Sequence, residues 1–303
     1  MRILVREFVT EGGYERQAPP PSLVREGAAM RAALIADLIA IGHHEIVSTV
    51  AGADAVWLIA PETGGCLERL ARRAEQDGRL LLGSGAAAVR RAADKAGLAQ
   101  ILAHHGVSYP ATRVVRTAAE GRDAAHELGY PVVVKPRRGA GSVGVSLARN
   151  DAELCHGLSR VRAVGRDAAL VQRYIRGVAA SVSLLANGTR AVPLTVNGQT
   201  FDPRRRFSYR GGITPIDHPL ARQAAEQGRR ACEAIGGLRG YVGVDLVLTD
   251  KEAVVIEINP RLTTAYLGVR AAIDSNIAAL ALAACDGHLP DMVSAKRQVR
   301  FKA

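Results

Sequence analysis

The segment YPVVVKPRRGAGSVGVSLARN, residues 130–150, joins a short apolar strand to a basic, glycine-rich loop. Val132 to Val134 are β-branched and few enough to form one buried strand, which Pro136 ends. Gly139, Gly141 and Gly144 follow, and backbone N–H groups with no Cβ nearby can approach phosphate oxygens closely. Lys135 and the next two arginines add positive charge. The pattern is typical of a phosphate-binding loop and equally of a basic hairpin turn.

The composition indicates a globular protein with an ample core. Its 303 residues could form one large domain or two to three small ones, and 48% of them are hydrophobic. No apolar run reaches the roughly 18 residues of a membrane span, and Arg6 and Glu7 interrupt the N-terminal apolar stretch. We therefore expect a cytoplasmic protein with no membrane partner. The four cysteines lie far apart in the sequence and predict reduced, mostly buried thiols.

The formal net charge of +11 raises the possibility of a nucleic-acid partner. The basic residues are spread along the chain, however, and aromatic residues make up only 4% of it, so no basic run alternates with stacking aromatics. We expect a small anionic ligand and no nucleic acid. Only five of the 40 basic residues are lysines, so a lysine inside a motif suggests a site that needs a compact ammonium group.

The chain divides into three parts, residues 1–85, 86–172 and 173–303. Strands alternate with helices in the first part, which predicts a parallel sheet, while the other two predict α+β units, the last with antiparallel strands. Ligands favour the carboxyl edge of a parallel sheet, where the first strand meets the loop TEGGYE. Four residues near that edge are therefore candidates for substrate contacts: Glu7, Gly12, Gly13 and Glu26.

Three oxygen-bearing side chains are predicted to lie together on a hairpin formed by GVDLVL and VVIEINPR. Glu257 and Asn259 are two residues apart on one strand, so they share a face, beside Asp245 on the neighbouring strand. Oxygen ligands without histidine or thiolate suit Mg²⁺ or Mn²⁺. A solvated sheet face is the alternative, but both carboxylates lie inside strongly apolar strands, where a charge needs a partner.

With ADK at 93–95, VVVKP at 132–136 and VQRYI at 171–175, this order resembles the ATP-grasp enzymes from end to end. The resemblance implies a Rossmann-like pre-ATP-grasp α/β domain over residues 1–85. It also implies an ATP-grasp small (lid) subdomain over 86–172 and a C-terminal subdomain with a metal site over 173–303. ATP and Mg²⁺ (or Mn²⁺) are the implied cofactors, and family analogy adds a homodimer as an expectation.

The resemblance also implies roles for single residues. Asp245, Glu257 and Asn259 would be the metal ligands, and Arg261 would approach the transferred phosphate or the acyl-phosphate. The nucleotide contacts would be Lys95, Lys135, Arg138, Gly139, Gly141, Ser142, Gly144, Gln172, Tyr174 and Ile175. The hinge departs from the family, because Arg173, Ala179 and Ala180 occupy the region where many members carry acids for the ribose, which puts ribose recognition in doubt.

The implied reaction joins a carboxylate to an amine through an acyl-phosphate. Segments such as IAPETGG, LGSG and YRGGITP resemble the tyramine–glutamate ligases of methanofuran synthesis, so glutamate with tyramine or tyrosine are the expected substrates. The alternatives are a ligase for another amino acid or peptide, of the D-alanine–D-alanine or lysine-pathway type, and a nucleotide-binding protein without turnover. We further expect SYRGGITP, residues 208–215, to be a loop that brings Arg210 to the acyl-phosphate, unless Arg210 is a surface arginine in a flexible turn.

Overall fold

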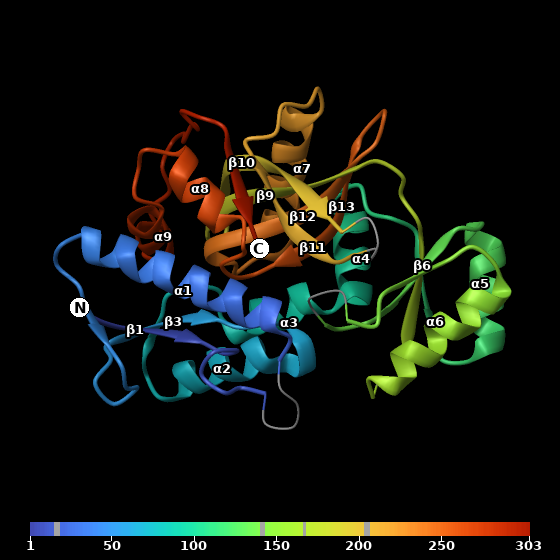
Figure 1. Cartoon of the computed structure of the whole chain (residues 1–303), viewed down its shortest axis with the longest axis horizontal. Coiled ribbons are helices and arrows are strands. Elements are labelled where there is room, and N and C mark those ends of the chain that lie inside the picture. The colour runs from blue at the N-terminus through green and yellow to red at the C-terminus, as the bar shows by residue number, and fades with distance from the viewer. Residues whose placement is uncertain (15–18, 140–142, 166–167, 203–206) are drawn as a thin grey trace.

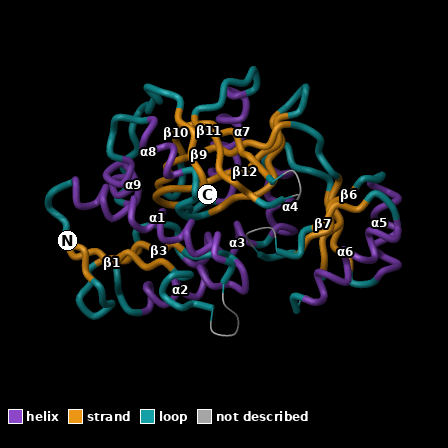
Figure 2. Tube along the Cα trace, in the orientation of Figure 1, coloured by secondary structure: helices purple, strands orange, loops and turns teal. Residues whose placement is uncertain are grey.

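The computed structural model describes residues 1–14, 19–139, 143–165, 168–202 and 207–303. This part of the chain contains three β-sheets, two of four strands and one of six (Figure 1). Figure 2 shows one of the smaller sheets, with its two helices α5 and α6, set apart from the rest of the chain at one end of the molecule.

The first sheet is parallel, as the sequence predicts, and its strand order is β2-β1-β3-β4. Ile3 and Val5 point to one face, where they pack with the long first helix, and Leu4 points to the other, beside the second helix. The elements are β1 (Arg2–Glu7), α1 (Pro21–Ala40), β2 (Glu45–Val47), β3 (Ala55–Ile59), the 3₁₀ turn η1 (Thr63–Gly65), α2 (Cys66–Gln76) and β4 (Leu80–Leu81).

The second sheet is antiparallel, in the order β5-β8-β6-β7. Its strand β6 is the predicted apolar strand, and Pro136 is its last residue. Val132 and Val134 pack against the helices, so Lys135 faces the opposite side. The elements are β5 (Thr112–Val115), α5 (Ala118–Leu128), β6 (Val132–Pro136), β7 (Ser146–Ala148), α6 (Asp151–Ala163) and β8 (Ala169–Arg173).

The third sheet has six antiparallel strands in the order β13-β12-β9-β10-β11-β14. The predicted turn at 249–252 joins β12 to β13. The strands are β9 (Val178–Asn187), β10 (Ala191–Phe201), β11 (Tyr209–Thr214), β12 (Arg239–Leu248), β13 (Ala253–Asn259) and β14 (Val299–Lys302). The helices around it are α3 (Ala86–Ala93), α4 (Lys95–His104), α7 (Ala221–Ile235), α8 (Tyr266–Ala272) and α9 (Ile277–Cys285).

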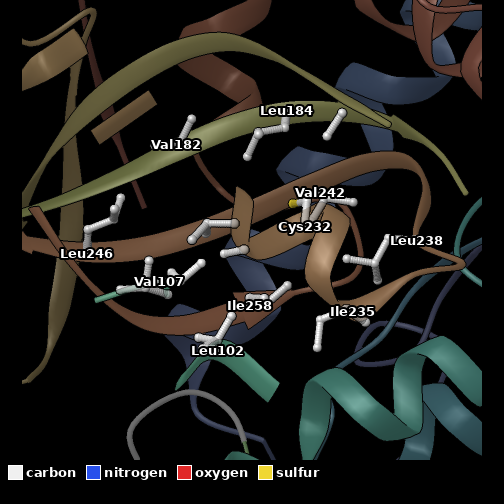
Figure 3. Packing of buried hydrophobic residues seen from close by; sticks show 14 of the residues in the cluster. Leu102, Val107, Val182, Leu184, Cys232, Ile235, Leu238, Val242, Leu246 and Ile258 are labelled. Atoms are coloured by element: carbon white, nitrogen blue, oxygen red, sulfur yellow. The ribbon is translucent and has the colours of Figure 1, made fainter. Parts of the chain in front are cut away.

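One face of the third sheet carries the largest apolar cluster (Figure 3). Val182 and Leu184 from β9 and Val242 from β12 pack there against Cys232 and Ile235 of α7. Ala92 of α3 and Leu102 of α4 belong to the same cluster. The two helices that precede the second sheet in the chain therefore pack on the third sheet, and they carry the start of α4 to its edge.

Helix α9 packs on the opposite face of the third sheet, and α1 lies between α9 and the first sheet. Leu34 and Leu38 of α1 lie in one cluster with Ile3 of β1, Leu185 of β9 and Ala278 of α9. Because α1 contacts both the first sheet and the helices on the third, the carboxyl edge of the first sheet is held beside the face of the third sheet that carries Asp245 and Glu257.

Two expectations need correction. All four cysteines are free, but among them only Cys232 is fully buried, and the other three are partly exposed. Residues 209–214 form strand β11, where a loop was predicted, because they pair with β10 on one side and with β14 on the other.

Among the residues that the structure describes, no single helix has the length and apolar composition of a membrane span. One bent pair, Tyr266–Ala272 with Ile277–Cys285, meets both criteria when its two members are taken together, with an angle of 110° between them.

The packing in Figure 3 predicts a large effect of Leu184→Ala on stability. Leu184 is 0% exposed in a central strand, so its truncation leaves a cavity and should lower the free energy of unfolding by about 2–5 kcal/mol. Leu80→Ala is the matched control, because Leu80 is 55% exposed and its loss should change stability by no more than about 0.5 kcal/mol. Urea unfolding measures both, and equal effects of the two substitutions would contradict the packing described.

Candidate functional site

The predicted cluster of oxygen-bearing side chains is present on the third sheet. Asp245 of β12 lies directly opposite Glu257 of β13, two residues before Asn259. Asn259 Nδ2 donates to Asp245 Oδ2 at 3.0 Å, and Gln199 Nε2 from β10 donates to Asp245 Oδ1 at 2.9 Å. The juxtaposition predicted from strand alternation is therefore confirmed, and Gln199 is an addition that only the pairing of strands reveals.

The environment of Asp245 disfavours its negative charge. Burial raises the pKa of Asp245 to about 6, and the charge of Glu257 adds to the shift, while the hydrogen bonds from Asn259 and Gln199 oppose it. Two carboxylates this close need a shared cation. In the structure a lysine pairs with one of them, Glu257.

Lys95 brings a positive charge to these carboxylates from the first residue of α4. Its Nζ lies 2.9 Å from Glu257 Oε1 and donates to the carbonyl oxygen of Gly139 at 2.7 Å. Asp94 caps the helix by accepting from the Gly97 N–H, and the Lys95 N–H donates to the carbonyl of Arg137. Lys95 is 5% exposed. Its ammonium group connects Glu257, one of the predicted metal ligands, to the glycine-rich loop.

Lys135 lies at the same place without a hydrogen-bond partner among the described residues. It is 4% exposed at the end of β6. Burial lowers the pKa of Lys135 to about 7, with the charge of Lys95 adding to the shift and that of Glu257 opposing it. A buried ammonium group with unused donors is a ready contact for an anionic ligand, because an anion would restore its charged form.

The glycine-rich loop is described only at its two ends. Gly139 has φ +149° and Gly144 has φ +77°, and a Cβ on Gly144 would come within 3.0 Å of Pro136 Cγ. Both positions therefore favour glycine. Gly141 and Ser142 lie outside the described residues. Arg138 is paired with Glu68 of α2 at 3.5 Å and with Asp94 at 3.9 Å.

The connection after β8 presents backbone groups. The strand ends at Arg173, so Tyr174 and Ile175 lie in the connection to β9. Gln172 is buried and donates to Thr112 Oγ1 at 2.9 Å, which makes it part of the sheet's own structure. The Ile175 N–H bonds to no described residue. Ala180 belongs to the core, so no ribose-binding group stands at that position.

Arg261 lies on the edge of the site that faces the first sheet. Its Nε donates to Glu62 Oε1 at 2.9 Å and its Nη2 to Glu62 Oε2 at 3.1 Å. Burial opposes the charge of Arg261, but Glu62, Glu257 and Asp245 outweigh it, so its pKa is raised. Sequence analysis missed Glu62. The available signal was a polar residue just after a buried strand, at the carboxyl edge where ligands bind.

Of the four candidates from the first sheet, only Glu26 faces this site. It accepts a hydrogen bond from Thr264 Oγ1 at 3.2 Å, and burial raises its pKa. Glu7 is buried and accepts from the N–H groups of Val9 and Thr10, so it organises the loop after β1.

The two glycine candidates belong to the same loop. Gly12 has φ +80°, and a Cβ on Gly13 would collide with the Phe8 ring at 2.4 Å. Backbone conformation and packing thus account for both residues.

Arg210 does not lie where the sequence predicted. It is exposed on β11 and paired with Asp202. Its neighbour Tyr209 is the residue close to the site, because burial and the charges of Asp245 and Glu26 raise the pKa of Tyr209. Successive side chains of a strand point to opposite faces, so a strand that carries Tyr209 toward Asp245 carries Arg210 away from it.

The assembled residues fit a divalent cation that is shared with an anionic ligand. Among the described residues, no group of three or more His, Cys, Asp or Glu could hold a metal alone. The carboxylates of Asp245 and Glu257 and the side-chain amide oxygen of Asn259 supply part of an oxygen shell. The ammonium group of Lys95 already marks the position of a cation at Glu257. Phosphate oxygens of a ligand held by Lys135 would complete the shell. The arrangement can therefore bind a polyphosphate with its cation.

Comparisons with known proteins agree with this geometry. Residues 92–265 match the family model of the ATP-grasp domain, and residues 31–89 match that of the pre ATP-grasp 3 domain. An ATP-grasp superfamily protein from Archaeoglobus fulgidus is 26% identical, with a TM-score of 0.73 over 98% of this chain and 91% of that one. The D-alanine–D-alanine ligase from Bacillus anthracis, complexed with ATP, is 22% identical with a TM-score of 0.66 over 86% of each chain, which shows the shared fold.

Curated relatives match over shorter stretches. The tyramine–L-glutamate ligase of Methanocaldococcus fervens is 40% identical over 101 residues, which are 33% of this chain and 33% of that enzyme. The D-alanine–D-alanine ligase of Desulforudis audaxviator is 30% identical over 200 residues, which are 61% of this chain and 64% of that enzyme. The matched stretches thus span from one third to just under two thirds of these relatives.

The lowered pKa of Lys135 predicts how the free energy of unfolding depends on pH. Its folded pKa of about 7 lies below the usual 10.5, so between these values the unfolded chain holds more protons and stability should rise with pH. Lys135→Met removes the buried charge and should stabilise the protein most at pH 7 and below, with the gain shrinking as the pH rises. The exposed Lys251→Met is the control. Urea unfolding at pH 7 and at about pH 9.5 measures the difference, and a gain that does not depend on pH would contradict the shift.

Proposed function

Because the chain belongs to the ATP-grasp family, we propose that it is an ATP-dependent ligase that joins a carboxylate to an amine and releases ADP. One observation carries the proposal. Two buried lysines from different elements, Lys95 and Lys135, converge with Glu257 beside Asp245 at the junction of the three sheets. Two buried ammonium groups, of which only Lys95 is paired with a described carboxylate, indicate a site whose ligand supplies the missing negative charge.

The nucleotide would lie between the second and third sheets. Lys135 would bind its phosphates from β6, and Lys95 would bind them from α4 after leaving Glu257. The N–H groups of the glycine-rich loop would close over the phosphates. The N–H of Ile175, which bonds to no described residue, would bind the base, since a backbone donor in a connecting segment needs no specific side chain. These roles extend the sequence expectations for Lys95, Lys135 and Ile175.

Asp245, Glu257 and Asn259 would hold Mg²⁺ or Mn²⁺. When bound, the cation neutralises phosphate charge and orients the γ-phosphoryl group. The residues of this chain prepare the position. Gln199 and the Asn259 amide hold the Asp245 carboxylate by hydrogen bonds. Lys95 would remain paired with the Glu257 carboxylate until the cation and the nucleotide bind together.

The chemistry needs positioning and charge neutralisation more than a protein nucleophile. A substrate carboxylate would attack the γ-phosphorus, the bond to the β-phosphate oxygen would break, and an acyl-phosphate and ADP would form. The amine would then attack the acyl carbon, lose a proton, and expel inorganic phosphate to leave an amide. Arg261 stands at the edge of the site, where its charge would stabilise the acyl-phosphate.

Glutamate with tyramine or tyrosine is the substrate pair we propose, in a pathway of the methylofuran type. The 40% identity with a tyramine–L-glutamate ligase supports it. The 30% identity with a D-alanine–D-alanine ligase over 200 residues supports the second candidate, a ligase for another amino acid. A nucleotide-binding protein without turnover is the less favoured reading, because both lysines and all three oxygen ligands are present at one site.

Turnover of Mg·ATP tests the proposal. ADP release should require L-glutamate together with tyramine or tyrosine, and mass spectrometry should detect the amide. ADP release with other amino acids instead would favour the second candidate, and no ADP release over a screen of amino acids would contradict a ligase. Glu257→Gln should lower the rate by orders of magnitude, because it removes one carboxylate charge from the cation position. Glu252→Gln, on the exposed turn of the same hairpin, should leave the rate unchanged.

ATP binding tests Lys135 directly. Lys135→Met keeps the apolar stem but loses the ammonium group, so ATP affinity should fall about tenfold to a hundredfold while adenosine binding stays the same. At about pH 8 the wild type should take up close to one proton on binding ATP, because the phosphates restore the charge of a lysine with a pKa of about 7. Calorimetry in buffers of different ionisation enthalpy measures both effects. Equal affinity and equal proton uptake in the variant would remove Lys135 from the phosphate site.

A further inference from the structure

The ion pair between Glu62 and Arg261 joins two parts of the chain that lie 199 residues apart. Glu62 follows β3 of the first sheet, and Arg261 follows β13 of the third, two residues after Asn259. The Glu62 side chain is 2% exposed, so the carboxylate is removed from water and Arg261 is its ion-pair partner. A buried bidentate pair of this kind fixes the plane of a guanidinium group.

The hydrogen bonds of Arg261 leave one edge of the guanidinium free. A guanidinium has five N–H donors. Nε and one Nη2 hydrogen go to Glu62, and one Nη1 hydrogen goes to the carbonyl of Leu262 at 3.1 Å. Among the described residues these are its acceptors, so one N–H remains on each Nη nitrogen. Two such donors side by side match two oxygens of one phosphoryl or carboxylate group.

Glu62 also keeps Arg261 away from the carboxylates of the cation position. Asp245, Glu257 and Glu26 all lie near enough to act on Arg261 or to be acted on by it. A guanidinium released from Glu62 would turn to one of these carboxylates, where it would compete with the cation. The backbone of Glu62 is itself held, since its carbonyl accepts from the Gly65 N–H at 3.0 Å.

We propose that Glu62 is a positioning residue, which holds the free edge of Arg261 toward the two oxygens of the transferred phosphoryl group or the acyl-phosphate. The role rests on the proposed function, because it needs an oxyanion formed beside the nucleotide. It makes the first sheet part of the chemistry, although the nucleotide and cation residues all come from the other two sheets and from α4. Loss of Glu62 should weaken oxyanion binding and leave nucleotide binding intact.

The test uses the whole protein loaded with Mg·ADP and titrated with inorganic phosphate, so it contains neither acid nor amine. In Glu62→Gln the new amide donor opposes one N–H of Arg261, and phosphate affinity should fall about tenfold or more. The affinity for Mg·ATP should stay within about twofold of wild type. Arg261→Lys keeps a positive charge but removes the paired donors, and it should show the same selective loss. It serves as the deciding variant should Glu62→Gln fail to fold.

Asp37→Asn is the matched control. Asp37 on α1 accepts from Arg270 Nε at 2.9 Å and from Nη2 at 2.5 Å, so it forms another bidentate pair between the same two parts of the chain, outside the site. Phosphate affinity should be unchanged in this variant. An equal loss in Asp37→Asn and Glu62→Gln would show general loosening and overturn the positioning role.

The remaining outcomes distinguish a failure of the role of Glu62 from a failure of the proposed function. Wild-type phosphate affinity in Glu62→Gln, or a wild-type Mg·ADP complex that binds no phosphate, would overturn the role of Glu62 and leave the proposed function standing. Failure of the wild type to bind Mg·ADP would instead overturn the proposed function itself.

Discussion

Charges buried at the junction of three sheets must be paired, and the ion pair between Lys95 and Glu257 shows how far the protein meets that requirement alone. Arg261 is matched by Glu62 in the same way. Two groups are left in an unfavourable state, Lys135 with a pKa lowered to about 7 and Asp245 with a pKa raised to about 6. The imbalance is therefore concentrated on the two groups that the proposed nucleotide and cation would relieve.

This balance explains why the cation and the nucleotide would bind together. A cation alone would have to displace Lys95 from Glu257 and leave its ammonium unpaired, and a polyphosphate alone would meet the carboxylates of Asp245 and Glu257. Together they would exchange partners, because Lys95 would move to a phosphate as the cation took the carboxylate. The Gly139 carbonyl takes part, since it accepts from Lys95 and so connects the glycine-rich loop to the same exchange.

The arrangement depends on helix α1, which packs on the first sheet and on helices α8 and α9, and α9 in turn packs on the third sheet. Asp37 near its end binds Tyr266 at 2.5 Å and Arg270 of α8, and Glu26 near its start accepts from Thr264. The segment that runs from Thr264 into α8 is thus held by both ends of α1. A site whose parts are this far apart in sequence needs such a shared layer, because no local segment could align them.

The sequence by itself determined the elements whose signal is local. The apolar strand that ends at Pro136, the hairpin with Glu257 and Asn259 two residues apart, and the alternation of the first 85 residues all follow from periodicity and turn residues. Tertiary structure alone decided what long-range pairing controls. Strand β11 forms because β10 and β14 supply partners, which turns Arg210 away and brings Tyr209 in. The place of Glu62 after a buried strand could mark it as a candidate, but its pairing with an arginine 199 residues away is visible only in the tertiary structure.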